Sequence, residues 1–239
     1  NFWNKHASTL ARAAQQYGVP EHILVGIIGV ETIYGQYMGD TNVFDVLTTV
    51  AFDYPRRSDE YKKFLEEYIV LTKTNKMPLR SVAGSYAGAI GIPQFMPDSW
   101  RDYGVDFDGD GKVDLRNSTA DAIGSVANFL KQKGGWVPNQ DVVYAVKFDN
   151  DEPKIKELLA KPIEPSLTYR QIKDFGISSP ENIRSDIKLS LIDLPNGDKA
   201  TSYVLGSRNF YAITRYNKSY MYAMSVYDLG SAVAKARLK

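Results

Sequence analysis

One acidic side chain stands in a row of apolar ones. Three apolar residues precede Glu31 at helical spacing, namely Leu24 (i), Ile27 (i+3) and Ile28 (i+4), and the acid is at i+7. On a helix these four residues share the face predicted to pack in the core. Burying an unpaired carboxylate is costly, and the usual relief is a raised pKa that keeps the group protonated. A protonated carboxyl can act as the general acid for a glycosidic oxygen. The alternative is a structural Glu at the edge of the row, paired with an arginine.

A second group of acidic residues follows the pattern of an EF-hand calcium loop. Asp106, Asp108 and Asp110 alternate along the chain, and Gly111 follows where that loop needs a sharp turn. Lys112 would add its backbone carbonyl. Clustered carboxylates repel one another unless a cation lies between them, so we predict a structural Ca²⁺ ion here and no cofactor for the chemistry itself.

The end of this loop departs from the EF-hand pattern. Asp114 is at the ninth position, but the twelfth, where the pattern requires Glu, is Asn117. Mg²⁺ or Na⁺ in place of Ca²⁺, or a loop of Asx turns without an ion, are the alternatives.

Composition excludes several other chemistries. The chain has no cysteine, which removes thiol nucleophiles and thiolate metal sites. The two histidines, His6 and His22, occur without a GxSxG or HExxH motif, so neither a serine hydrolase nor a zinc hydrolase is indicated. Because 29 Lys and Arg residues nearly balance 28 Asp and Glu residues, a nucleic-acid partner is not expected.

Periodicity and turn residues predict the elements that position these groups. Helices are expected over residues 4–17, 22–35, 58–74, 121–133 and 219–238. The Gly- and Ala-rich segment 85–96 is predicted to be a short helix or turn that leads into a loop. A β-hairpin is expected from 187–194 and 199–205, joined by an Asn-Gly turn. The fold class is therefore α+β and predominantly α, with a small β-containing insertion.

Six segments occur in order and together carry a family resemblance. They are VETIYG (30–35), YPRRS (54–58), SYAGAIGIPQFMPDSW (85–100), DFDGDGKVDL (106–115), DAIGSVANFL (121–130) and ITRYNKSYMYA (213–223). With this combination the chain resembles the membrane-bound lytic transglycosylase B family of bacterial cell-wall enzymes over essentially its whole length. The resemblance implies a lysozyme-like helical core, and a metal loop longer than an EF-hand and closed by Asp121.

The resemblance also implies an activity. Such enzymes cleave the bond between N-acetylmuramic acid (MurNAc) and N-acetylglucosamine (GlcNAc) in peptidoglycan, and the muramoyl 6-hydroxyl attacks its own anomeric carbon. The product carries a 1,6-anhydromuramoyl end, and the N-acetyl group of the substrate is expected to stabilise the cationic intermediate. Glu31 occupies the position of the family's single catalytic glutamate, which acts first as acid and then as base.

Further residues match the family's substrate cleft. Ser85, Gln94 and Phe95 match residues that line the cleft near the glutamate. Arg56 and Arg57 match a basic pair able to reach peptide or lactyl carboxylates, to which the arginine fork binds in a bidentate manner.

A last set of matching residues lies in the remaining segments. Tyr216, Asn217 and Tyr222 match a cluster near the acid that positions the sugar. Phe129 stands where relatives can have Tyr. A Phe at this position would keep the stacking on a sugar ring but lose the contact of a tyrosine hydroxyl with a sugar hydroxyl. For every residue carried over in this way the alternative role is packing or surface solvation.

The predicted organisation is one compact catalytic unit over residues 1–239. The lysozyme-like core takes 1–53 and 85–140 with the metal loop at 106–121, a helical insertion takes 54–84, a β-containing subdomain takes 141–212, and a core helix takes 213–239. Peptidoglycan glycan strands are the expected partner, with proteins of cell-wall synthesis or remodelling as candidates, and we expect a monomer. The expected location is the periplasm, with any outer-membrane lipid anchor upstream of this sequence.

Two other functions fit part of the sequence. A lysozyme-like hydrolase would need a second carboxylate to place water, and Asp53, Asp98 or Asp102 could serve. A calcium-stiffened module that binds peptidoglycan without turnover would not need Glu31.

Overall fold

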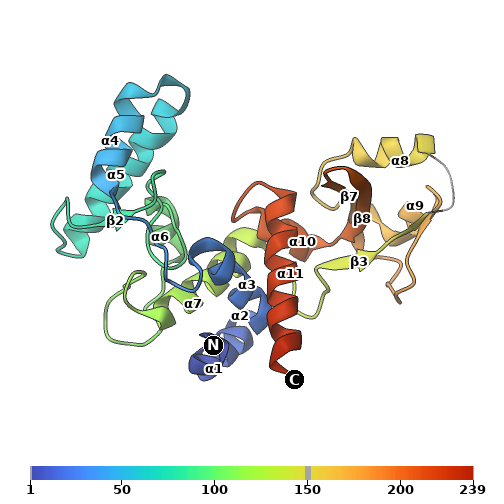
Figure 1. Cartoon of the computed structure of the whole chain (residues 1–239), viewed down its shortest axis with the longest axis horizontal. Helices are drawn as coiled ribbons and strands as arrows, with labels where there is room; N and C mark the ends of the chain where they lie inside the picture. The colour runs from blue at the N-terminus through green and yellow to red at the C-terminus, as the bar shows by residue number, and fades with distance from the viewer. Residues whose placement is uncertain (1, 149–151, 239) are drawn as a thin grey trace. The chain divides into compact units, whose positions relative to one another are not determined.

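The computed structural model describes residues 2–148 and 152–238 (Figure 1). Its internal contacts divide the chain into two compact units, one formed by residues 1–129 and 228–239 and the other by residues 130–227. The helix-rich α+β class predicted from the sequence is confirmed. The finer division of the chain into core, insertion and subdomain stays a prediction.

The first unit is almost entirely helical. Its elements are α1 (Phe2–Lys5), α2 (Ala7–Tyr17), α3 (Glu21–Thr32), β1 (Thr41–Asn42), α4 (Val43–Asp53), η1 (Pro55–Arg57), α5 (Ser58–Thr74), β2 (Ala83–Gly84), α6 (Pro97–Tyr103), α7 (Thr119–Phe129) and the part of α11 (Tyr220–Arg237) from Asp228 onward. Helix α3 is central because it is apolar on every side, and residues 23–29 are buried without interruption.

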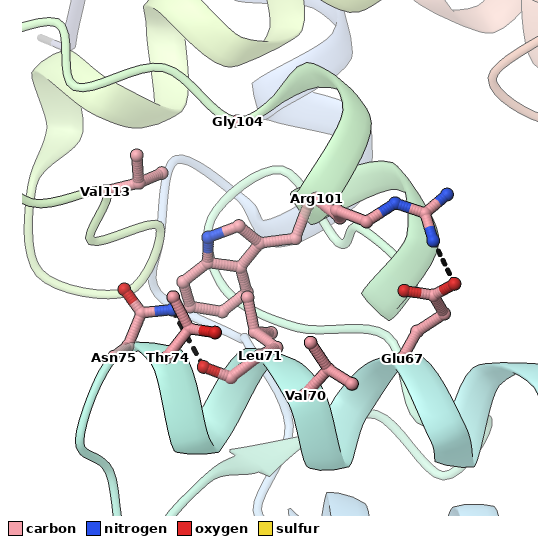
Figure 2. A pocket seen from close by; sticks show the side chains of 9 residues that line it. Glu67, Val70, Leu71, Thr74, Asn75, Arg101, Gly104 and Val113 are labelled. Atoms are coloured by element: carbon pink, nitrogen blue, oxygen red, sulfur yellow. Dashed lines mark hydrogen bonds and ion pairs between the residues drawn. The ribbon is translucent and has the colours of Figure 1, made fainter.

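Helices α4 and α5 lie side by side in this unit (Figure 1). Tyr61 and Tyr68 of α5 are buried, and their hydroxyls donate to the carbonyls of Ala87 and Leu79, both at 2.9 Å. A cavity of about 220 Å³ between α5 and α6 is walled in part by Trp100, and Figure 2 shows Arg101 of α6 reaching Glu67 of α5. The second helix of the pair therefore fixes the loops that follow it.

The second unit contains the β structure. Its elements are η2 (Leu130–Gly134), β3 (Val143–Ala145), β4 (Lys147–Phe148), α8 (Glu152–Leu159), β5 (Leu167–Thr168), α9 (Tyr169–Lys173), β6 (Ile177–Ser178), β7 (Lys188–Asn196), β8 (Lys199–Gly206), α10 (Arg208–Thr214) and the start of α11. An antiparallel sheet has the order β3-β8-β7-β5, and β4 pairs with β6. Its core includes Ile172, Leu189 and Leu205.

Most predicted elements are confirmed, and their ends show where local signals failed. Helix α5 spans 58–74 as predicted. The predicted hairpin β7–β8 is present, but its two turn residues are Gly197 and Asp198, one residue later than the predicted Asn196-Gly197, because Asn196 pairs with Lys199. The helix predicted over 22–35 ends at Thr32, and the one predicted over 121–133 becomes a π-helix from Leu130. Segment 85–96 forms turns and no helix, and α4 is a helix that the sequence did not predict.

No helix in the described part of the chain combines the length and the apolar character that crossing a bilayer requires.

Candidate active site

Glu31 lies on the last turn of α3, where the buried run ends. The run of fully buried positions stops at Gly29, and both Val30 and Glu31 are half-buried. The apolar row predicted that Glu31 would face the core; instead, the helix is buried on all sides from Ile23 to Gly29, and in its last turn Glu31 is half-buried while Thr32 is buried. Glu31 is thus presented at the edge of the core rather than inside it.

The backbone immediately after Glu31 takes a left-handed path. Ile33, Tyr34 and Gly35 have φ angles of 49°, 62° and 85°. This region is unfavourable for any residue with a Cβ and especially for β-branched isoleucine. Such strained backbone persists only where surrounding contacts enforce it, and it is typical of functional sites. The turn reverses the chain directly beside the acid.

The loop carrying Ser85 and Gln94 is held by its own polar groups. The Ser85 hydroxyl oxygen accepts from the backbone N–H groups of Ala87 (3.3 Å) and Ala89 (3.0 Å). Gln94 has a φ of 52°, and its Nε2 donates to the carbonyls of Gly91 (2.8 Å) and Met38 (3.2 Å). Both predicted cleft residues therefore shape the loop, and their contact with substrate stays a prediction.

The Glu31 turn and this loop are joined directly. The Thr32 hydroxyl donates to the carbonyl of Ile92 at 3.0 Å, and the Gln94 amide adds the bond to Met38. Strands β1 and β2 pair Asn42 with Ala83 just before Ser85. The fold thus brings the end of α3, which carries Glu31, to the loop that carries Ser85 and Gln94, more than fifty residues later in the sequence.

The two arginines lie in η1, at the start of α5. Arg57 forms an ion pair with Glu60 at 2.8 Å, and its guanidinium lies 4.7 Å from the centre of the Tyr61 ring. Because the Tyr61 hydroxyl donates to Ala87, η1 is tied to the loop that contains Ser85. Arg56 is exposed, and within the described residues it has no hydrogen-bond or ion-pair partner.

The two phenylalanines are buried. Phe95 and Phe129 are only 2% and 5% exposed, and their ring centres lie 5.6 Å apart. Tyr103 packs edge-on against Phe129 at 5.0 Å. These rings support the loop from within the first unit, and the predicted stacking of Phe129 on a sugar stays a prediction.

The tyrosine cluster belongs to the second unit, where Tyr216 lies between α10 and α11 and Tyr222 lies in the first turn of α11. The rings of Tyr216 and Tyr222 are nearly parallel, with centres 6.4 Å apart and an interplanar angle of 12°. Both are half-buried, and Asn217 between α10 and α11 is exposed. The role of these three residues near the acid stays a prediction.

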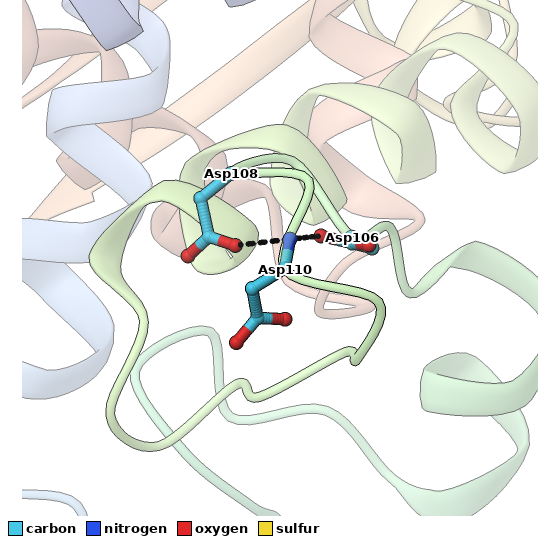
Figure 3. Close-up of side chains that lie close together, drawn as sticks. All are labelled: Asp106, Asp108 and Asp110. Carbon is cyan, nitrogen blue, oxygen red and sulfur yellow. Dashed lines mark hydrogen bonds between the residues drawn. The ribbon is translucent and has the colours of Figure 1, made fainter.

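The aspartate loop brings its first three carboxylates together. One oxygen of each of Asp106, Asp108 and Asp110 lies within 4.8 Å of the other two (Figure 3). Asp106 also accepts from the backbone N–H groups of Gly109 (2.7 Å) and Gly111 (2.8 Å), which curls the loop around this point. Converging carboxylate oxygens are the ligands that a hard cation prefers, so the residues fit a calcium ion.

The environment of Asp121 differs from that of the three clustered aspartates. It is 1% exposed and accepts from the backbone N–H groups of Phe107 (2.7 Å), Asp108 (3.3 Å) and Asp114 (2.8 Å). Burial raises the pKa of this carboxyl, and the three N–H donors oppose that rise. Asp121 therefore ties both ends of the loop to α7, while its role as a metal ligand, like that of the Lys112 carbonyl, stays a prediction.

Three residues that hold the loop over residues 85–96 in place could not be recognised from the sequence. Thr32, Tyr61 and Leu115 each bond to the loop over residues 85–96, but each looks like an ordinary packing residue in the sequence. A partial signal existed for Thr32, a β-branched hydroxyl residue between an acid and a strained turn. The partners of Tyr61 and Leu115 are backbone groups, which leave no trace in side-chain patterns.

Comparison with known proteins supplies the family. The family model described as "Transglycosylase SLT domain" matches residues 1–231. Over 238 residues the chain is 41% identical to the membrane-bound lytic murein transglycosylase B of Escherichia coli (strain K12), covering 100% of this chain and 63% of that protein. The chain therefore spans less than two thirds of that relative's length.

Solved structures agree over nearly the whole chain. The catenated lytic transglycosylase SltB1 from Pseudomonas aeruginosa matches with a TM-score of 0.92 and 45% identity, covering 99% of this chain and 76% of that chain. E. coli Slt35 in complex with calcium matches with a TM-score of 0.88 and 40% identity, covering 100% of this chain and 73% of that chain. P. aeruginosa SltB3 in complex with NAG-NAM-pentapeptide matches with a TM-score of 0.85 and 31% identity, covering 96% of this chain and 61% of that chain. The resemblance drawn from six sequence segments is confirmed, and this chain belongs to the transglycosylase SLT domain family.

Proposed function

We propose that this chain is a lytic transglycosylase that cleaves the MurNAc–GlcNAc β-1,4 bond of peptidoglycan and leaves 1,6-anhydromuramoyl ends. The observation that carries the proposal is the position of Glu31, half-buried on the last turn of α3 and fixed against the loop of Ser85 and Gln94. Family membership and the murein-cleaving relatives support the same substrate.

The chemistry needs one carboxyl group in two successive roles. Glu31 gives its proton to the glycosidic oxygen, so the C–O bond to the anomeric carbon breaks and the GlcNAc alcohol leaves. The muramoyl 6-hydroxyl then attacks that carbon, and the Glu31 carboxylate takes the hydroxyl proton. The acid is regenerated and no water is consumed, which accounts for an active site with one acid on a rigid helix.

Surrounding residues are assigned supporting roles in this proposal. Ser85 and Gln94 would bind sugar hydroxyl or acetamido groups, with Phe95 and Phe129 as apolar support. Arg56, exposed and without a protein partner among the described residues, suits a stem-peptide or lactyl carboxylate, with Arg57 beside it. Tyr216, Asn217 and Tyr222 would position the sugar, as the family resemblance implies.

Product analysis separates this function from its alternatives. Mass spectrometry of fragments released from purified sacculi should show muramoyl ends lighter by one water than reducing ends. Reducing ends would favour a hydrolase, and binding without release would favour a non-catalytic module. Two of the candidate second carboxylates are already engaged, because Asp98 accepts from Ser99 N (2.7 Å) and Asp102 pairs with Arg101 (2.7 Å), which supports the single-acid scheme.

We infer that the aspartate loop holds a structural calcium ion. Asp106, Asp108 and Asp110 would supply carboxylate oxygens, with the Lys112 carbonyl and Asp121 as the further predicted ligands. The calcium complex of Slt35 supports this choice of ion. When bound, the ion neutralises the clustered charges and stiffens the loop, and it takes no part in glycan cleavage.

Removing the ion is expected to lower stability. A ligand at a hundredfold excess over its Kd stabilises the folded state by about 2.7 kcal/mol, so we expect calcium to raise the Tm by about 5–10 °C relative to chelator. Differential scanning calorimetry with calcium and with EDTA checks this. Asp110→Asn should abolish the response, whereas Asp198→Asn, an exposed aspartate in the β7–β8 turn, should retain it. Identical melting curves in the two buffers would remove the case for the ion.

The proposed substrate also sets the expected environment. Peptidoglycan strands are the proposed partner, since a relative's structure contains a NAG-NAM-pentapeptide. We propose a periplasmic location by analogy with the membrane-bound relative, a monomeric state, and contacts with proteins of cell-wall synthesis or remodelling.

A further inference from the structure

We propose that Thr32 is a positioning residue for Glu31. Its hydroxyl holds the end of α3 that carries the acid against the loop over residues 85–96. This inference rests on the proposed function, in which Glu31 transfers the proton. Thr32 is the next residue in the chain, so any movement of its backbone moves Glu31 as well. Its side chain is 1% exposed, which keeps it away from substrate.

The hydroxyl of Thr32 lies between two backbone groups. As a donor it reaches the carbonyl of Ile92 at 3.0 Å, whereas the carbonyl of Ile28 within its own helix is farther away, at 3.4 Å. As an acceptor it takes the N–H of Gly35 at 3.0 Å. One hydroxyl therefore closes the left-handed turn on one side and joins it to the loop on the other.

The other side of the Ile92 peptide is also anchored. Its N–H donates to the carbonyl of Leu115, a residue of the aspartate loop (106–121), at 2.8 Å. Ile92 itself is 5% exposed, so both hydrogen bonds are shielded from water. The carbonyl that accepts the hydrogen bond from Thr32 therefore belongs to a residue that is itself held by a second buried hydrogen bond.

The strained turn needs such an anchor. Ile33 and Tyr34 hold left-handed φ angles that would relax if their restraints were removed. The backbone bonds Ile33 N to Gly29 O (3.0 Å) and Tyr34 N to Ile28 O (3.2 Å) end the helix, but they do not connect it to the loop. The Thr32 hydroxyl makes that connection, and its loss should let the end of α3 and Glu31 shift relative to Ser85 and Gln94.

Thr32→Val tests the hydroxyl because it preserves the side-chain shape. A misplacement of about 1 Å can cost about a hundredfold in rate, so we expect kcat on soluble glycan strands to fall about 10- to 100-fold with KM changed less than about twofold. Thr32→Ser keeps the hydroxyl and should restore kcat to within about threefold of the parent. A kcat for Thr32→Val equal to that of the parent overturns the proposal, as does a Ser variant as impaired as the Val variant.

Thr72 supplies the matched control. It is 2% exposed in α5 of the same unit, and its hydroxyl donates to Ile69 O at 3.0 Å, away from the acid. Thr72→Val should lower the Tm about as much as Thr32→Val and leave kcat unchanged; equal losses of kcat in the two variants would assign Thr32 to general stability and overturn the proposal. If the valine variants do not fold, Thr32→Ala and Thr72→Ala are compared by the same criteria.

The outcome is distinguishable from failure of the proposed function. Glu31→Gln is assayed in parallel on the same strands. An active Glu31→Gln variant removes the proposed function and the inference together. An inactive Glu31→Gln with a fully active Thr32→Val removes the role of Thr32 alone.

Discussion

Glu31→Gln is expected to abolish glycan cleavage while leaving the fold intact. Proton transfer by a positioned group contributes about 10²–10⁴-fold to a rate, and Glu31 serves in two transfers, so we expect a loss of at least about a thousandfold. Glutamine keeps the volume and one accepting oxygen but has no proton to give at neutral pH. Release of anhydromuramoyl products from sacculi, measured by mass spectrometry, gives the rate.

The same helix supplies a control for the loss of a carboxylate. Glu21, in the first turn of α3, is also half-buried, and it accepts from the Trp3 indole N–H at 2.7 Å. A glutamine oxygen can take that bond, so Glu21→Gln should keep nearly full activity. Both variants should melt within a few degrees of the parent. Substantial cleavage by Glu31→Gln would reject the single-acid scheme, and substantial loss in Glu21→Gln would show that the assay reports helix integrity.

Gly91→Ala is expected to cause a large loss of stability, although it adds only one methyl group. Gly91 has a φ of 75°, and a Cβ there would lie 2.4 Å from the carbonyl oxygen of Leu115, the atom that accepts from Ile92 N–H. The left-handed conformation costs about 1–2 kcal/mol for a residue with a Cβ, and overpacking adds about 1–3 kcal/mol. We therefore expect the free energy of unfolding to fall by about 2–5 kcal/mol, measured by urea titration with circular dichroism.

Gly109→Ala separates the cost of the left-handed backbone from the cost of the steric clash with Leu115. Gly109 lies in the same unit with a φ of 81°, but a Cβ there would have no atom within 4 Å. In buffer with chelator, so that metal binding does not enter, this variant should lose only the cost of the left-handed backbone. The two variants should therefore differ by about 1–3 kcal/mol, the overpacking contribution. Equal losses would mean that the loop moves away from Leu115 without cost.

The candidate site residues could be identified from the sequence because their types are unusual in their positions. Three aspartates that alternate before a glycine follow a local rule, and the structure brings their carboxylates together. An acid in an apolar helix breaks a local rule, which is why Glu31 was predicted to be the acid. The helix over 58–74 and the hairpin were also predicted, since their hydrophobic periods and turn signals are local, although the turn lies one residue later than predicted.

Local signals failed where contacts between distant segments decide the backbone. Helix α4 was missed, although Asn42 caps it by accepting from Asp45 N at 3.2 Å, because its short apolar run suits a helix or a strand equally. The end of α3 was predicted three residues too late, since a left-handed Ile33 contradicts its own propensity and is enforced by neighbours.

The sequence by itself determined the carboxylate cluster, the family and most of the regular elements, and it singled out Glu31 as the candidate acid, because each is encoded by residue type and spacing along a short stretch of chain. Tertiary structure alone decided that Glu31 emerges from the core on the last turn of α3, and that Thr32 and Ile92 are in contact. Those outcomes depend on hydrogen bonds to backbone carbonyls sixty residues away. Every residue has a backbone carbonyl, so no pattern of side chains predicts which carbonyl will accept the hydrogen bond.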